Sequence, residues 1–187
     1  MKIAICIKQV PDSWAEKKMA GGVLDRAGVD AVLNDLDEYA VEEALRIVEA
    51  NSPTKEAGEG SGHTITLISM GPERATEAIR KALSMGADDA ILVTDPSLAG
   101  SDALATSLVL SEVIKKGNYD LVLCGTESTD ARMSVIPAMI SQRLGWAQLT
   151  FGVYVMVDPA AYTFEFERVT EFGNQVMSAK FPAVLSV

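Results

Sequence analysis

Tyr119-Asp-Leu-Val-Leu-Cys-Gly-Thr-Glu-Ser-Thr-Asp130 joins a short apolar run to a loop of hydroxyl and carboxylate side chains. The run Leu121–Cys124 is typical of a buried strand, and it ends at Gly125. A new apolar helical pattern opens at Met133. In an open parallel sheet, ligands bind where the carboxyl end of a strand meets the next helix. Free backbone N–H groups and the positive helix end favour phosphate there, so we expect a nucleotide or another anionic ligand between Gly125 and Ser134.

Strands and helices alternate outward from this stretch. Apolar runs predict strands at Lys2–Lys8, His63–Met70, Asp89–Thr94 and Tyr119–Cys124, and a short one at Val23–Arg26. Amphipathic patterns predict helices at 36–50, 71–86, 102–116 and 133–145, with Asn34 or Asp35 capping the first and Ser101 the third. The order predicts an α/β fold with a doubly wound, mostly parallel sheet of the Rossmann-like, adenine-nucleotide-binding type.

The pattern changes from Gln148 onward, where the chain reads as short strands separated by turn residues. Four segments look like antiparallel strands: Val153–Val157, Thr163–Arg168, Gln175–Lys180 and Ala183–Val187. We therefore expect a single domain over 1–187, with an α/β core over 1–147 and antiparallel strands over 148–187. The low-complexity segment Asn51–Gly62 is expected to be a mobile surface loop inside that domain.

Composition indicates an ordinary globular chain. The 187 residues are 48% apolar and 22% charged, which suffices for one sizeable core. A net charge of −10 argues against nucleic acid and anionic membrane surfaces as partners. No apolar run approaches the roughly 20 residues that a membrane span needs, so we expect no membrane insertion. The two cysteines, Cys6 and Cys124, lie in apolar strands without metal or redox spacing, which favours a reduced, cytoplasmic setting.

The usual signatures of a self-contained active site are absent from the sequence. No Gly-x-Gly-x-x-Gly follows the first strand, and no Gly-Lys-Ser/Thr phosphate loop occurs. The single histidine, His63, stands beside the low-complexity segment. Adjacent carboxylates such as Glu42-Glu43 and Asp88-Asp89 do not converge on one point. We therefore predict no catalytic residues and no metal site, and we expect a binding or carrier function.

Five short motifs follow one another from the first strand to the end of the chain. They are Lys2-Ile-Ala-Ile-Cys-Ile-Lys-Gln-Val-Pro-Asp12, Asn34-Asp-Leu-Asp-Glu-Tyr-Ala-Val-Glu-Glu-Ala-Leu45, Met70-Gly-Pro-Glu73 with Ala82-Leu-Ser-Met-Gly-Ala-Asp88, Asp120-Leu-Val-Leu-Cys-Gly125, and Glu167-Arg168 through Glu171 to Phe181-Pro-Ala-Val184. In this order they resemble the beta subunit of electron-transfer flavoprotein, the FixA-like family.

The resemblance implies an electron carrier rather than an enzyme. Members of the family form a heterodimer with an alpha subunit that holds the main flavin, FAD. The pair carries electrons from acyl-CoA or other flavin dehydrogenases to a quinone oxidoreductase. The implied location is the cytoplasm of a bacterium or the mitochondrial matrix of a eukaryote. Relatives continue for several dozen residues beyond the last motif, so we expect this sequence to be a shortened form.

The resemblance also implies a buried adenine nucleotide, either a structural AMP or, in the electron-bifurcating branch, a second FAD. The matching positions here are Cys6, Asn34, Asp35, Leu36, Asp37, Met70, Gly125, Thr126, Glu127, Ser128, Thr129, Asp130, Ala131, Arg132, Met133, Ser134, Val135 and Ile136. The pattern of the chain agrees, because these residues follow three strand ends and open one helix, which meet at one edge of such a sheet.

Part of the loop departs from the family pattern. Many relatives carry amide and hydroxyl side chains where this chain has 131–136, which leaves Arg132 and Ser134 for side-chain contacts to phosphate. Arg132 can pair with phosphate or point to solvent. Asp130 would repel phosphate, so it accepts backbone hydrogen bonds, contacts a ribose hydroxyl or meets a cation. We favour the backbone role, in which Asp130 caps the following helix.

Two other functions remain open from the sequence. One is an adenine-nucleotide-binding module similar to the universal stress proteins, although their glycine-spaced phosphate loop is missing after Cys124. The other is an enzyme with its site in the loop Asp12–Asp25, which has no evident base or nucleophile. On the flavoprotein interpretation, Pro11–Trp14 and Leu36 face the flavin of the alpha subunit.

Overall fold

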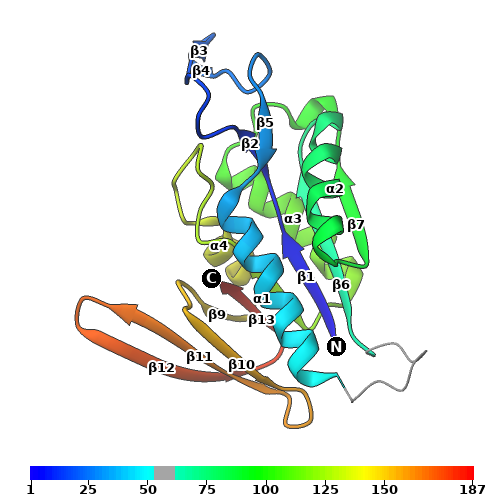
Figure 1. The fold of residues 1–187 in the computed structure, drawn as a ribbon, viewed down its shortest axis with the longest axis vertical. Helices are drawn as coiled ribbons and strands as arrows, with labels where there is room; N and C mark the ends of the chain where they lie inside the picture. Colours follow the sequence, from blue (N-terminus) through cyan, green and yellow to red (C-terminus); the bar gives the residue numbers. More distant parts are fainter. Residues whose placement is uncertain (53–61) are drawn as a thin grey trace.

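The central element of the computed structural model, which describes residues 1–52 and 62–187, is a six-stranded sheet (Figure 1). Every neighbouring pair of its strands is parallel. The strands lie in the order β7 (Asp89–Val93), β6 (Thr64–Met70), β1 (Lys2–Cys6), β8 (Leu121–Cys124), β13 (Ala183–Ser186) and β9 (Ala147–Leu149).

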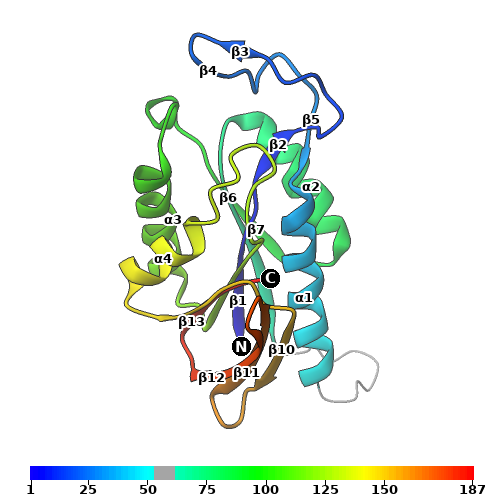
Figure 2. The same cartoon turned by 90° about the vertical axis from the view of Figure 1, so that its left-hand side faces the viewer.

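Helices cover both faces of this sheet (Figure 2). One face carries α1 (Asp35–Asn51) and α2 (Thr76–Met85), and the other carries α3 (Ala103–Gly117) and α4 (Ile136–Leu144). Two short 3-10 helices, η1 (Glu73–Ala75) and η2 (Pro96–Leu98), follow β6 and β7. This arrangement confirms the predicted doubly wound α/β fold.

The alternation of side chains along the central strands produces two cores. On β1, Ile3 and Ile5 join the cluster that also contains residues of α1 and α2. The intervening Ala4 and Cys6 join a second cluster with residues of α3 and α4. Because successive residues of a strand point to opposite faces, a strand covered on both sides must be apolar throughout. This requirement explains the unbroken apolar runs in the sequence.

A separate three-stranded antiparallel sheet packs beside α1. It consists of β10 (Tyr154–Asp158), β11 (Thr163–Thr170) and β12 (Gly173–Lys180). Phe164 and Phe166 of β11 are buried in the core cluster on the α1 side. Arg46 of α1 lies over the ring of Tyr154, 5.1 Å from its centroid. The predicted antiparallel extension is therefore present over these three strands.

The prediction of a fourth antiparallel strand at Ala183–Val187 is wrong. This segment forms β13, which returns to the central sheet and pairs parallel with both β8 and β9. All four residues of β13 are buried. Burial on both faces is typical of a parallel strand and does not fit a half-exposed antiparallel one. Ala147–Leu149, which carries no clear strand pattern, supplies the edge strand β9.

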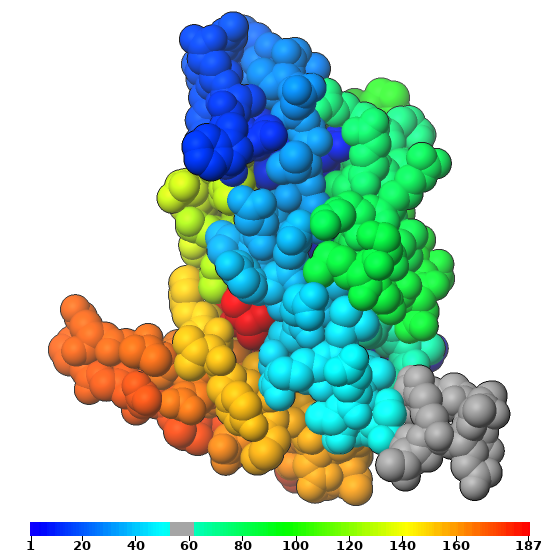
Figure 3. Space-filling view, viewed as in Figure 1, coloured from blue at the N-terminus to red at the C-terminus, as the bar shows by residue number. Residues whose placement is uncertain are grey.

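Between the first strand and the first helix, the chain leaves the body of the molecule. β2 (Gln9–Pro11) pairs antiparallel with β5 (Ala31–Leu33), and beyond this ladder lies a small hairpin of β3 (Met19–Ala20) and β4 (Val23–Leu24). We call residues 12–30 the arm. It stands at the top of the molecule in Figures 1 and 3, in dark blue, beyond the carboxyl ends of the central strands.

Several helix boundaries differ from the sequence prediction. The cap of α3 is Asp102, whose Oδ1 accepts a hydrogen bond from the Ala105 N–H at 2.8 Å, whereas Ser101 Oγ donates to the Leu98 carbonyl. α4 begins at Ile136 rather than Met133. The loop 125–135 is therefore longer than expected. Of the loop predicted at 51–62, residues 53–61 lie outside the described part of the chain.

Replacing the observed cap should weaken α3. Asp102→Ala removes the only side-chain acceptor recorded for the first turn of α3 in the described structure, so we expect a loss of about 1 kcal/mol in the free energy of unfolding. Ser101→Ala, at the position that the sequence favoured, should cost less. Urea denaturation followed by circular dichroism measures both. A larger loss in Ser101→Ala would contradict the assignment of the cap.

Candidate functional site

The predicted site residues meet at one edge of the central sheet. Cys6 and Cys124 are register partners at the carboxyl ends of β1 and β8, and both are buried. Met70, at the end of β6, and Ile136, at the start of α4, pack against the same core cluster. The start of α1 also reaches this edge, because Gly125 lies against Leu36. The structure thus brings together segments that are far apart in the sequence.

Asn34 fixes the loop that follows β8. Its side chain is completely buried. Nδ2 donates to the Glu127 carbonyl at 2.9 Å, and Oδ1 accepts from the Thr129 N–H at 3.0 Å. Asn34 does occupy the N-cap position of α1, but its side chain makes no capping hydrogen bond there. The prediction that Asn34 or Asp35 caps this helix is confirmed for the position of Asn34, but its side-chain polar atoms bond to the loop instead of to the helix.

Asp37 joins the first strand to the first helix. Its side chain is buried, and Oδ2 accepts a hydrogen bond from the Lys8 N–H at 2.7 Å. Burial raises the pKa of this carboxyl to about 7, against the opposing effect of hydrogen bonds from Asn34, Lys8 and Gly125. A Cβ at Gly125 would lie 2.5 Å from Asp37 Oδ1 and 2.7 Å from the Leu36 carbonyl carbon, so this approach requires glycine.

Asp130 is the buried centre of an ionic cluster whose two cations are partly exposed. Its carboxylate lies 2.7 and 2.9 Å from Lys8 Nζ and 2.8 Å from Arg26 Nε, and its side chain is 1% exposed. Burial alone would raise the pKa of Asp130, but hydrogen bonds from Lys8, Arg26 and Ser128 outweigh it and lower the pKa to about 2. The expectation that Asp130 caps the next helix is wrong, because two cations hold it and α4 begins only at Ile136.

The second half of the loop carries two residues in the left-handed region. Arg132 has φ 50° and Ser134 has φ 54°. Ser134 Oγ donates to Glu127 Oε2 at 3.0 Å, and Arg132 Nη1 lies 3.9 Å from Glu127 Oε1. The Arg132 side chain is 69% exposed, and Met133 is also exposed. Backbone strain of this kind is concentrated at functional sites in proteins.

Three charged side chains at this edge form a cluster with a net positive charge. The cluster of Lys8, Arg26 and Asp130 has a formal charge of +1 beside the backbone of the loop. Thr129 Oγ1 is buried there without a hydrogen-bond partner among the described residues.

Nowhere in residues 1–52 and 62–187 do three His, Cys, Asp or Glu side chains gather as a metal site would require. None of the described helices has the length and apolarity needed to cross a membrane.

Lys8 and Arg26 are the site residues that the sequence did not reveal. They lie 122 and 104 residues from Asp130 along the chain. Lys8 follows the first strand directly, and its position at the carboxyl end of that strand was a usable signal. Arg26 lies in the exposed arm, and no local pattern indicates that it reaches the loop.

The raised pKa of Asp37 predicts a pH dependence of stability. Between about pH 4 and 7 the unfolded chain loses the Asp37 proton while the folded chain retains it, so the free energy of unfolding falls as the pH rises through this window. Asp37→Asn removes this titration. The stability of the variant relative to the wild type should therefore increase by a few kcal/mol from pH 4 to 7, at about 1.4 kcal/mol per pKa unit.

Urea titrations across this pH range measure the difference between the two proteins. Asp35→Asn, two residues away and exposed, removes the same charge and should run parallel to the wild type. If Asp37→Asn were also parallel, the carboxyl would not be protonated in the folded protein.

Comparison with the sequences of known proteins places this chain in a family. A family described as "Electron transfer flavoprotein domain" matches residues 21–187. The electron transfer flavoprotein subunit beta of Mycobacterium tuberculosis is 45% identical over 188 residues, which cover 99% of this chain and 68% of the relative. The subunit beta of Megasphaera elsdenii is 36% identical, covering 100% and 68%, and protein FixA of Azotobacter vinelandii is 38% identical, covering 100% and 65%. The chain therefore belongs to the electron transfer flavoprotein family, among relatives of the beta-subunit and FixA type.

Proposed function

We propose that this chain is the beta subunit of a heterodimeric electron transfer flavoprotein. In this role it binds an adenine nucleotide at the loop 125–135 and completes the flavin site of an alpha subunit that holds FAD. The assembled pair carries electrons from flavin dehydrogenases to a quinone-linked acceptor. Membership of the family supports the electron-transfer role. The chain contributes binding surfaces rather than catalytic groups.

The nucleotide proposal rests on the ammonium and guanidinium groups of Lys8 and Arg26 at the carboxyl ends of β1 and β8. Lys8 Nζ lies between Asp130 and Ser128 Oγ, 3.2 Å from the hydroxyl, and 39% of its side chain remains exposed. Nζ already donates to both Asp130 oxygens and to Ser128 Oγ, so a phosphate at this position would share or replace one of these hydrogen bonds. The Thr129 hydroxyl, which has no hydrogen-bond partner among the described residues, is a further candidate contact. Arg132, which is exposed beside Glu127, is an additional candidate.

AMP is the occupant that we favour. A second FAD contains the same adenosine monophosphate group and would make the same contacts with it. AMP and FAD therefore differ only in the part of FAD that extends beyond this group. The universal stress protein alternative loses its support, because the chain belongs to another family. Mass spectrometry of the ligand released by denaturation tests the proposal. AMP or FAD would support it, whereas ATP would contradict it.

Removal of the Lys8 charge should weaken binding of the phosphate more than binding of the nucleoside. For Lys8→Met we expect the Kd for AMP to rise about tenfold, the loss of one charge-assisted hydrogen bond, with little change for adenosine. Isothermal calorimetry with both ligands measures this difference. Lys115→Met, an exposed lysine of α3, is the matched control. Equal losses for AMP and adenosine would place the phosphate elsewhere.

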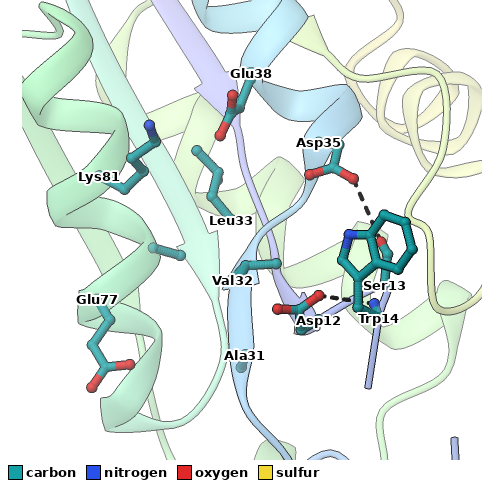
Figure 4. A pocket seen from close by; sticks show the side chains of 11 residues that line it. Asp12, Ser13, Trp14, Ala31, Val32, Leu33, Asp35, Glu38, Glu77 and Lys81 are labelled. Carbon is teal, nitrogen blue, oxygen red and sulfur yellow. Dashed lines mark hydrogen bonds between the residues drawn. The ribbon is translucent and has the colours of Figure 1, made fainter. Parts of the chain in front are cut away.

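A groove beside the arm is the proposed contact with the alpha subunit. It has a volume of about 440 Å³ and lies between the arm, the start of α1 and α2 (Figure 4). Trp14 is one of the residues that line this groove, and 97% of its surface is exposed. Such exposure of a tryptophan is unfavourable in water and is typical of a side chain that a partner covers. Asp12 accepts from the Trp14 N–H at 2.9 Å, so it braces this turn.

Loss of the Trp14 ring should weaken the heterodimer. For Trp14→Ala we expect the Kd for the alpha subunit to rise about 30-fold, because a buried aromatic anchor typically contributes about 2 kcal/mol. Flavin absorbance of the complex should fall with it. Leu104→Ala removes an exposed apolar side chain from α3, on the other face of the sheet, and serves as control. Unchanged co-purification and flavin absorbance would refute the assignment.

A further inference from the structure

Side chains of the body hold the arm at residues 26–29 from two sides, in addition to the hydrogen bond from Ser13 Oγ to Asp35 Oδ2 at 3.5 Å near the base of the arm. On one side, Arg74 of η1 donates from Nη1 to the Ala27 carbonyl and from Nη2 to the Val29 carbonyl, each at 3.0 Å. On the other side, Arg26 donates from Nε to Asp130 Oδ2 at 2.8 Å. Arg26 is the arm residue that connects to the loop 125–135 through an ion pair. Asp130 is therefore one of the anchors of the arm, and it is the one that lies in the loop 125–135.

The two partners of this ion pair differ in their freedom to move. The Asp130 side chain is 1% exposed and is also held by Lys8 at 2.7 Å, so the acceptor is the more constrained of the two partners. The Arg26 side chain is 46% exposed and projects from a segment that is itself mostly exposed. A change of charge at the loop therefore acts mainly on the position of Arg26, and so on the arm.

We infer that Arg26 is a positioning residue that couples the occupancy of the loop to the orientation of the arm. This inference rests on the proposed nucleotide site and adds a link from that site to the partner surface. Lys8, Arg26 and Asp130 together carry one positive charge, so a phosphate placed at the loop attracts the guanidinium and stabilises the attached arm. Adenosine has no such charge and leaves the arm unchanged.

The coupling acts in both directions. If the nucleotide phosphate stabilises the attached arm, an attached arm must tighten the binding of the nucleotide by the same factor. Trp14 lies on the arm, so the surface offered to the alpha subunit becomes better ordered when AMP is bound.

Fluorescence of Trp14 tests the coupling directly. The chain has two tryptophans, so Trp146→Phe leaves Trp14 as the single reporter. In this background we expect AMP, but not adenosine, to raise the fluorescence anisotropy of Trp14 and to reduce its quenching by acrylamide. With Arg26→Met added, the initial anisotropy should be lower and the response to AMP should disappear. Arg26→Lys, which keeps the charge, should restore part of the response.

Lys18→Gln is the matched control, because it removes one positive charge from the arm at an ion pair with Glu16 that does not involve the loop. It should respond to AMP as the parent does. Calorimetry on the same proteins should show that Arg26→Met weakens AMP binding by about fivefold, at the low end of measured couplings, without affecting adenosine.

The outcomes separate this inference from the proposed function. If the parent protein binds AMP by calorimetry but Trp14 does not respond, or Arg26→Met responds as the parent does, the coupling is refuted and the nucleotide site stands. If the parent binds no AMP at all, the proposed site is refuted and the coupling with it.

Discussion

The hydrogen bond between the buried Asp37 carboxyl group and the Lys8 N–H is the contact on which the functional edge depends. It joins the end of the first strand to the first turn of α1, and it brings α1 so close to β8 that only glycine fits at position 125. Because Asp37 sets this spacing, Asn34 can reach the loop after β8 with both of its polar atoms. The loop then holds Asp130 where Lys8 and Arg26 meet it. A single buried carboxyl thus fixes the geometry of four segments.

The sequence predicted the elements whose signals are local. The strands around 2–8, 63–70, 89–94 and 119–124 and the helices between them were recovered, because their patterns follow directly from burial on two faces. The pairing of β13 was predicted wrongly, because no local pattern in Ala183–Val187 indicates which strands it pairs with. The ends of α3 and α4 shifted by one to three residues, as expected where several capping residues compete.

For the candidate site, too, the features with a local sequence signal were predicted and those that depend on long-range contacts were not. Cys6, Met70 and the loop from Gly125 lie at strand ends, which a parallel sheet necessarily gathers at one edge. The side-chain roles were harder to predict. Asn34 has high capping propensity, yet a tertiary partner takes its side chain. The contact between Arg26 and Asp130 spans 104 residues and depends on the path of the arm, which no local pattern encodes.

The position of β13 has a consequence for how the chain reaches its folded state. β13 lies between β8 and β9, although it follows both of them and the whole of β10–β12 in the sequence. As the chain leaves the ribosome, the first four strands of the sheet, β1, β6, β7 and β8, can pair with one another once residue 124 has emerged. The outer edge of β8 stays unpaired until residues 183–186 emerge. An open, apolar strand edge is a template for pairing with other chains. Newborn chains that pause before this point would expose that edge to one another, which makes the last strand of the sheet a safeguard against aggregation.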